Sequence, residues 1–160
     1  MASRSGLRVT GVEDLVAALS NVGKTASSTT FSVMLAGAKR IQQRARAYAP
    51  VDEGNLEESI KIERVRSEQT GRTSIRVGVD EDHQLPSRPG KTVGAYAARM
   101  HEGTYNLGPK SLSKQQRLGV RVGRKFLERA LNDEKRQLEA EMLIAIAQTI
   151  RRANARRRGK

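Results

Sequence analysis

The stretch that decides the fold is Ala49-Pro50-Val51-Asp52-Glu53-Gly54-Asn55-Leu56, which is followed by Ser59-Ile60. Pro50 has no amide donor and forces the residue before it into extended geometry, so it ends any helix that precedes it. We predict that Asp52 caps a new helical turn by accepting a hydrogen bond from the amide of Gly54 or Asn55. Val51 and Leu56 have the spacing of a hydrophobic staple across that turn. The stretch therefore predicts a helix end, a structural corner and then a strand; the corner consists of Pro50, Val51, Asp52, Gly54, Asn55 and Leu56.

Apolar side chains before the corner recur at helical spacing. Residues 12–19 carry them at i, i+3, i+4 and i+7, which predicts a first helix that ends near Gly23. Residues 34–48 carry them at alternating steps of four and three, which predicts a second, longer amphipathic helix that ends at Pro50. Residues 7–10 fit a short strand.

After the corner the hydrophobic period changes from helical to two. Residues 60–63 and 75–79 alternate apolar with polar or small side chains, and residues 67–71 between them favour a turn. This pattern predicts an antiparallel hairpin with one buried face. The segment Asp80–Gly94 contains Pro86, Pro89, Gly90 and Gly94 and has no hydrophobic period, so we predict a long loop. Residues 95–100 fit either a short helix or another strand.

The C-terminal half ends in a clear helical pattern. Residues 103–123 are weakly patterned, whereas residues 124–153 carry apolar side chains with a helical period. We therefore predict a helix-rich α+β domain, in which two N-terminal helices and a long C-terminal helix pack on a small, mostly antiparallel sheet. Its bounds are residues 1–153, and residues 154–160 form a basic C-terminal tail.

Composition limits the class of protein. The chain has 160 residues, a formal net charge of +13, an aromatic content of 3% and no cysteine. The charge predicts attraction to polyanions, and the absence of cysteine leaves no disulfide framework. A core with so few aromatic side chains has a small margin of stability, which is an argument for oligomerisation. We see no secretion signal, and the longest apolar stretch, residues 142–147, is too short to span a bilayer.

No motif in the sequence supports catalysis. The two histidines, His83 and His101, have carboxylates nearby, but their spacing matches neither a calcium loop nor a zinc helix. The sequence has no Gly-x-Ser-x-Gly elbow and no complete phosphate loop. We therefore expect no catalytic residue, no cofactor and no metal ligand. A metal-dependent hydrolase that uses His101 and Glu102 is a distant alternative.

Three blocks of the sequence resemble a family of tailed-bacteriophage proteins. The first, Ala49-Pro50-Val51-Asp52-x-Gly54-Asn55-Leu56-x-x-Ser59-Ile60, is similar to the family's Ala-Pro-Val-Asp-Thr-Gly-x-Leu-x-x-Ser-Ile. Tyr96-Ala97-Ala98-Arg99-Met100-His101-Glu102-Gly103-Thr104 and Lys125-Phe126-Leu127-Glu128-Arg129-Ala130-Leu131 resemble two later blocks, in the same order. The chain differs from the family in having Glu53 for Thr, no Phe between Glu102 and Gly103, and no proline in the third block. Members are called head–tail joining (neck) proteins, tail completion proteins or minor tail components.

The resemblance implies a virion structural protein at the phage neck that is not an enzyme. Its subunits would form a homo-oligomeric ring of about six or twelve copies around the DNA channel. The ring would contact head-side connector or adaptor proteins and tail-side terminator or tube proteins, and DNA would pass through its lumen. The protein would be made in the host bacterial cytoplasm and would not bind membranes. A tail completion or tail terminator role stays open. Candidate interface residues are Tyr96, His101, Glu102, Gly103, Thr104 and Phe126, together with the segments Asp80–Gly94 and Gly103–Gly123.

The C-terminal end is dense in cations, and its role has three interpretations. It is a solubilising tail, it contacts DNA or another polyanion through phosphates, or it docks on an acidic neighbouring ring. It contains no aromatic side chain that stacks on bases. The net charge also favours an alternative to the structural role, a basic nucleic-acid-binding protein. The candidate polyanion contacts are Arg151, Arg152, Arg156, Arg157, Arg158 and Lys160.

Overall fold

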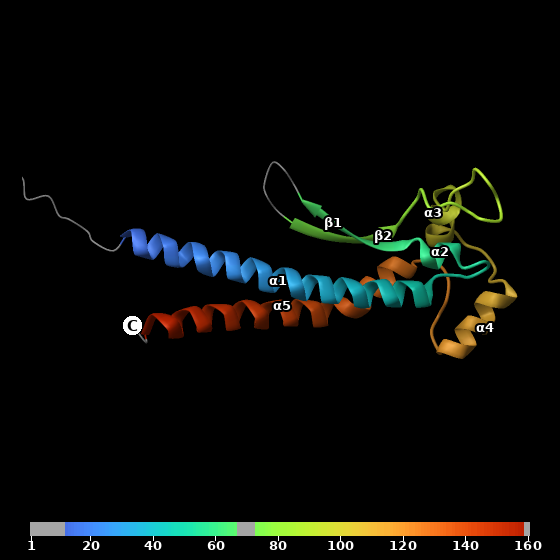
Figure 1. Cartoon of the computed structure of the whole chain (residues 1–160). Coiled ribbons are helices and arrows are strands. Elements are labelled where there is room, and N and C mark those ends of the chain that lie inside the picture. Colours follow the sequence, from blue (N-terminus) through green and yellow to red (C-terminus); the bar gives the residue numbers. More distant parts are fainter. Residues whose placement is uncertain (1–11, 67–72, 159–160) are drawn as a thin grey trace, which may run out of the picture. The chain divides into compact units, whose positions relative to one another are not determined.

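The computed structural model describes the backbone of residues 12–66 and 73–158, and the side chains of residues 28–66 and 73–155. The elements follow in the order α1 (Val12–Tyr48), α2 (Asn55–Glu58), β1 (Ile60–Arg66), β2 (Thr73–Val79), α3 (Gly94–Glu102), α4 (Pro109–Leu118) and α5 (Phe126–Arg158) (Figure 1). They divide into a larger compact unit, Met34–Ala140, and a smaller one, Met1–Val33 with Glu141–Lys160. The α+β class predicted from the sequence is confirmed.

The N-terminal part of the chain forms one helix where the sequence predicted two. α1 continues without a break through Gly23, where we expected the first helix to end. Glycine in a helix interior costs only about 1 kcal/mol relative to alanine, against about 3 kcal/mol for proline, so a single glycine does not have to end a helix. The other end is as predicted, because α1 stops at Tyr48, two residues before Pro50. The strand expected at residues 7–10 lies outside the described residues.

β1 and β2 form the antiparallel hairpin that the sequence predicted, and within the described residues the sheet has these two strands. The register pairs Ile60 with Val79, so their side chains lie on the same face. The side chains of Gln42 and Arg46 on α1 donate hydrogen bonds of 2.7 and 2.9 Å to the carbonyl oxygen of Ile60. These bonds fix the hairpin to the last turns of α1. The turn expected at residues 67–71 lies outside the described residues.

The core of the larger unit joins the hairpin to the helices. The segment between β2 and α3, predicted as a loop without pattern, is closed by a bridge between Gln84 and Thr92 and buries Leu85 and Val93. Residues 95–100, which the sequence left open between helix and strand, belong to α3. The core residues are Ile41, Ala45, Ala49, Leu56, Ile60, Leu85, Val93, Ala97, Phe126 and Ala130.

Within the larger unit, α1 and α5 are joined by a buried carboxylate. Glu134 is 1% exposed and accepts hydrogen bonds from Arg40 at 2.8 Å and Arg44 at 2.6 Å. Burial acts to raise the pKa of Glu134, but the hydrogen bonds from the two guanidinium groups outweigh it, so the pKa is lowered. The helices also approach closely at Gly37, where an added Cβ would meet a Leu138 methyl carbon at 2.5 Å.

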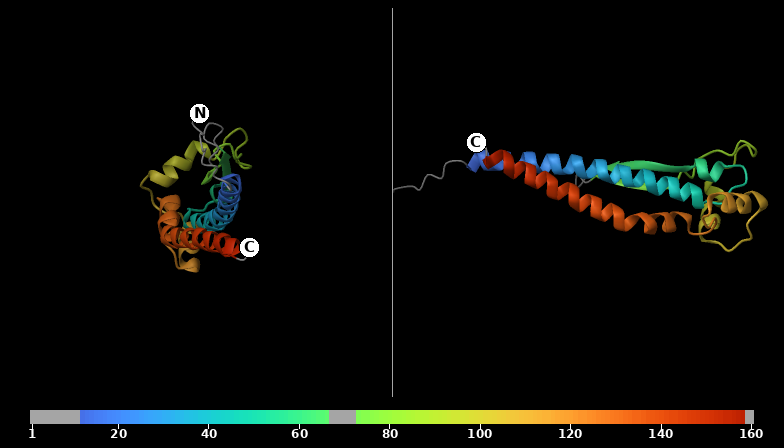
Figure 2. Two further views of the ribbon diagram at one scale, coloured as in Figure 1. Left: turned by 90° about the vertical axis from the view of Figure 1, so that its left-hand side faces the viewer. Right: turned by 90° about the horizontal axis from the view of Figure 1, so that it is seen from below.

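The smaller unit consists of the first part of α1 beside the last part of α5 (Figures 1 and 2). In this part of α5, Ala145 and Thr149 are buried, whereas Leu143, Ile144 and Ile150 are 70, 56 and 46% exposed. α5 extends beyond the predicted end at residue 153 and reaches Arg158. None of the helices in the described part of the chain has the length and hydropathy needed to cross a membrane.

Candidate interface at the Pro50 corner

Polar side chains of α4 hold the corner in place. The hydroxyl of Ser111 accepts a hydrogen bond of 2.9 Å from the amide of Val51 and donates one of 3.0 Å to the carbonyl of the same residue. The ammonium group of Lys110 donates a bond of 2.7 Å to the carbonyl of Asp52. A corner that leaves a helix has backbone groups without intrahelical partners, and α4 supplies those partners.

Lys114, one turn after Ser111 on α4, caps the C-terminus of α1. Its ammonium group donates hydrogen bonds to the carbonyls of Arg46 at 2.6 Å and Ala49 at 2.7 Å, and it forms an ion pair with Glu57 on α2. Only 7% of the Lys114 side chain is exposed. A cation is favourable there because the last carbonyls of a helix carry partial negative charge. One buried ammonium therefore ties α1, α2 and α4 together.

The cap predicted for the corner is wrong in its details. The residue before α2 is Gly54, in the left-handed conformation with φ of 92°, and no side chain caps the helix. Asp52 is exposed, and its carboxylate lies 3.5 Å from Lys110 Nζ. The corner is thus held by α4 rather than by its own Asp52. Pro50, Asn55 and Leu56 are buried as a corner requires.

The sequence did not predict α4, because the two residues that it buries, Ser111 and Lys114, are polar. Such a helix has no apolar period that would reveal it in the sequence. The available signals were Pro109 at the first turn and Gly119 just after the last, in the left-handed conformation with φ of 63°. These are the usual residues at a helix start and end.

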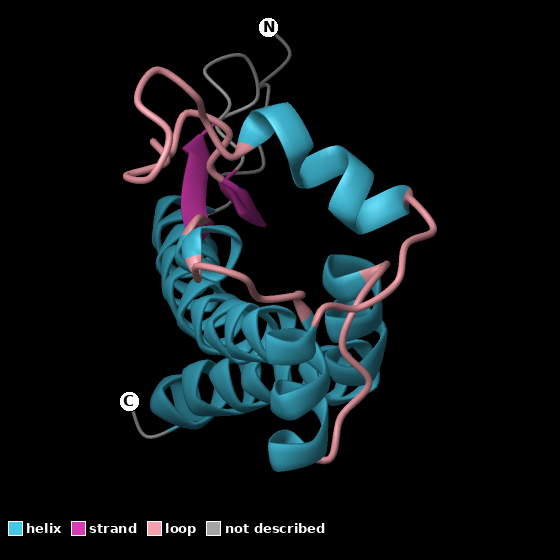
Figure 3. Ribbon diagram, turned by 90° about the vertical axis from the view of Figure 1, so that its right-hand side faces the viewer, coloured by secondary structure: helices cyan, strands magenta, loops and turns pink. Residues whose placement is uncertain are grey.

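An open groove of about 750 Å³ lies against the corner. Two of the chain's three tyrosines, Tyr96 and Tyr105, line it. The Tyr105 hydroxyl donates a hydrogen bond of 2.7 Å to the carbonyl of Met100, and burial raises the pKa of Tyr96. Figure 3 shows this end of the larger unit, where loops connect its short helices. The other lining residues include Pro50, Asp52, Glu53, Leu85, Arg88, Arg99, Met100, Leu107 and Pro109.

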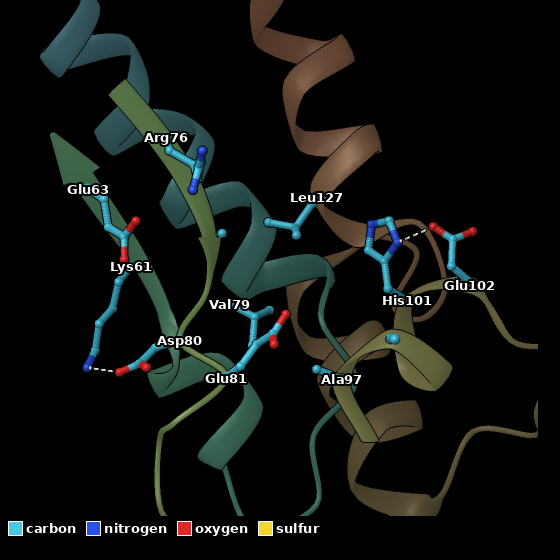
Figure 4. A pocket seen from close by; sticks show the side chains of 12 residues that line it. Lys61, Glu63, Arg76, Val79, Asp80, Glu81, Ala97, His101, Glu102 and Leu127 are labelled. Atoms are coloured by element: carbon cyan, nitrogen blue, oxygen red, sulfur yellow. Dashed lines mark hydrogen bonds and ion pairs between the residues drawn. The ribbon is translucent and has the colours of Figure 1, made fainter. Parts of the chain in front are cut away.

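A second concavity, of about 540 Å³, lies between the hairpin and α3 (Figure 4). The ammonium of Lys61 pairs with Asp80 at 2.5 Å, and this hydrogen bond lowers the pKa of Asp80. Glu102 pairs with Lys125 at 2.6 Å and with His101 Nδ1 at 2.8 Å, and both bonds lower its pKa, that from Lys125 more. His101 also packs edge-on against Phe126, with ring centroids 4.9 Å apart.

The predicted interface residues are divided between these two places. Tyr96 lines the groove, whereas His101 and Glu102 line the second concavity. Gly103 ends α3, where an added Cβ would lie 2.5 Å from the carbonyl oxygen of Arg99, so glycine is required there. Thr104 is exposed, and Phe126 is fully buried in the core. Their role in an interface stays a prediction.

The predicted polyanion contacts lie at the end of α5. Arg151 and Arg152 are exposed. Residues 156–158 belong to the helix, but their side chains are outside the described part, as is Lys160. Within the described residues, no three His, Asp or Glu side chains gather in a way that could hold a metal ion.

One family model matches the part of the chain that contains the corner. The family model described as "Bacteriophage HK97-gp10, putative tail-component" matches residues 13–99, which is more than half of the chain and includes the corner, the hairpin and most of α3. No curated protein and no solved structure matches the chain. On the strength of this match, the chain belongs to the HK97-gp10-like family of bacteriophage tail components, which are structural proteins of the virion.

Proposed function

We propose that this chain is a neck protein, which forms a ring between the DNA-filled head and the tail and surrounds the DNA channel. The proposal rests on the family match over residues 13–99 and on what the corner does in the fold. One rim of the ring would contact connector or adaptor proteins of the head, and the other would contact terminator or tube proteins of the tail. The mechanism is assembly rather than turnover.

The observation that carries the proposal is the groove at the corner. The corner's backbone groups are satisfied by α4, and its outer side forms an open depression with tyrosine, methionine and arginine side chains. These residue types are enriched in the centres of protein interfaces, because they provide a large contact area with few rotatable bonds or with directed hydrogen bonds. The groove is therefore suited to contact another protein.

Exposed apolar side chains on α5 support assembly as well. Leu143, Ile144 and Ile150 are about half exposed or more. They lie on a helix that already buries Ala145 and Thr149 on another face. A helix with apolar side chains on more than one face gains stability when the second face is covered too. A neighbouring subunit would provide that cover.

Deletion of the gene from the phage or prophage that encodes it tests the proposal, with electron microscopy of the lysate as the readout. We expect DNA-filled heads and separate tails side by side, because the joint between them is missing. Tails of abnormal length would indicate a tail terminator or other tail-assembly role instead. Normal infectious particles would overturn the structural role.

A basic nucleic-acid-binding protein is the second candidate, favoured by the net charge of +13 and by the four cationic residues among positions 155–160. Truncation after Asn154 separates the two, with DNA affinity measured at several salt concentrations. A dedicated DNA-binding protein would lose most of its affinity and show a shallower salt dependence, because fewer phosphates are contacted. A neck protein would still assemble into particles.

A further inference from the structure

The last part of α5 carries apolar side chains on two opposite faces. Ala145 and Thr149, four positions apart, are buried on one face, and the Thr149 hydroxyl donates a hydrogen bond of 2.9 Å to the carbonyl of Ala145. Leu143, Ala147 and Ile150 recur at steps of four and three, so they share a second face, which turns away from the first. These three residues form the outer stripe of α5.

The outer stripe is open to solvent. Leu143 is 70% exposed and Ile150 is 46% exposed, and Ala147 between them is exposed as well. Ile144, at the edge of the stripe, is 56% exposed. A helix that is apolar on more than one face is normally covered on each of them. The described part of the chain leaves the outer stripe uncovered, so removing it from water favours association with another molecule.

The charges on either side of the outer stripe narrow the choice of occupant. Residues 143–150 contain no charged side chain. Glu139 and Glu141 precede this stretch on α5. Arg151 and Arg152 follow it, and three more arginines lie further along the helix. A complementary helix therefore has an apolar centre, cations opposite the glutamates and carboxylates opposite the arginines. A second copy of α5 that runs antiparallel to the first has this order of residues.

The same charges separate an antiparallel from a parallel pair of helices. In a parallel pair, the five arginines between positions 151 and 158 of one copy would lie beside those of the other, and like charges repel. In an antiparallel pair centred near Ala147, Leu143 of one copy lies beside Ile150 of the other. The glutamates before the stripe then lie at the level of the arginines after it, so attraction replaces repulsion.

We propose that the outer stripes of two copies of the chain pack against each other antiparallel, with Ala147 near the two-fold axis. The contact is isologous, because the same surface serves in both copies, and it is complete with two subunits. A ring with two different rims needs head-to-tail contacts instead, so the pair is a form of the free protein that covers α5 before assembly. Only this last step rests on the proposed function; the pairing itself is a property of the purified protein.

Analytical ultracentrifugation of the wild type and of Leu143→Lys tests the pairing. We expect the wild type to be a dimer and the variant to have a dissociation constant at least about a hundredfold higher, because each dimer loses two buried leucines. Leu143 is 70% exposed in the single chain, so the variant stays folded, which circular dichroism checks. The matched control is Leu131→Lys, since Leu131 is 47% exposed on the same helix but outside the outer stripe; we expect it to pair as the wild type does.

Cross-linking measures the orientation, because the chain has no cysteine and single cysteines can be introduced. Ala140 and Asn154 are exposed and lie equally far before and after Ala147 on α5. In the antiparallel pair, Ala140 of one copy lies level with Asn154 of the other, whereas the two copies of either residue are about 21 Å apart along the helix. After subunit exchange, a short bis-maleimide should link Ala140→Cys to Asn154→Cys, and should link neither variant to itself.

Two sets of results would overturn the inference. A monomeric wild type would do so, as would a Leu143→Lys variant that associates as tightly as the wild type. Links of Ala140→Cys to itself and of Asn154→Cys to itself would show a parallel pair and overturn the antiparallel one. The neck role is tested separately by the gene deletion. Separate heads and tails, together with a monomeric purified protein, would leave the neck role standing and remove the dimer.

Discussion

The corner and the second concavity each contain a lysine–carboxylate pair, and water reaches the two lysines to very different degrees although the two carboxylates are equally exposed. At the corner, the side chain of Lys114 is 7% exposed and that of its partner Glu57 is 28% exposed. In the second concavity, the side chain of Lys61 is 51% exposed and that of Asp80 is 29% exposed. Breaking a buried pair leaves a desolvated charge, whereas an exposed pair contributes little. We therefore expect the Lys114–Glu57 pair to stabilise the fold and the Lys61–Asp80 pair to add little to its stability.

Replacing Lys114 by methionine should give the largest loss of stability. Lys114→Met keeps most of the side-chain volume but removes the cation, so that Glu57 and the carbonyls of Arg46 and Ala49 lose their partner. We expect the free energy of unfolding in urea to fall by about 3 kcal/mol.

Lys110→Met is the matched control, because Lys110 is on the same helix and contacts the same corner but its side chain is 65% exposed. We expect it to change the free energy of unfolding by less than about 1 kcal/mol. Equal effects of the two substitutions would contradict the distinction between buried and exposed pairs.

Replacing Glu134 by glutamine should have the next largest effect. The carboxylate is 1% exposed and accepts charge-assisted hydrogen bonds from Arg40 and Arg44. Both arginines are partly exposed, which limits the loss. We expect Glu134→Gln to lower the free energy of unfolding by about 2 kcal/mol. Glu139→Gln, at an exposed position of the same helix, should leave the free energy of unfolding nearly unchanged. An equal loss in both variants would show that the buried hydrogen bonds of Glu134 do not add to stability.

The stabilisation by Glu134 should depend on pH. Its pKa in the folded protein is lowered from the ordinary value of 4.5, so the unfolded state binds the proton more tightly. The contribution is therefore fully present above pH 4.5 and is lost as the pH falls through the lower folded value. Urea unfolding of wild type and Glu134→Gln at a series of pH values should show their difference shrinking below pH 4.5. A difference that stays constant into strong acid would contradict the assignment.

The hairpin and the end of α1 were predictable from the sequence because each depends on local chemistry. The period of two in residues 60–63 and 75–79 predicts the strands, and Pro50 predicts the helix end. The continuity of α1 through Gly23 was not predictable in this way, because the cost of one glycine in a helix interior, about 1 kcal/mol, is too small to decide whether a helix ends.

The buried polar contacts were beyond sequence reasoning for a different reason. Ser111, Lys114 and Glu134 belong to residue types that are usually exposed, and only the partners that the fold brings to them explain their burial. Those partners are 57 to 94 positions away in the sequence. The second concavity is similar, because Glu63 and Glu81 come together with His101 only once the hairpin packs beside α3.

Removing Lys61 should have the smallest effect on stability. Because the Lys61–Asp80 pair is exposed, Lys61→Met should leave the free energy of unfolding nearly unchanged. The pKa of Asp80 should rise toward its ordinary value, since the hydrogen bond from Lys61 is the largest cause of its lowering; NMR titration of the carboxyl carbon measures this. Unchanged stability with a raised pKa of Asp80 would show that the pair is a surface contact, whereas a large loss of stability would mean that it contributes to the fold as the Lys114–Glu57 pair does.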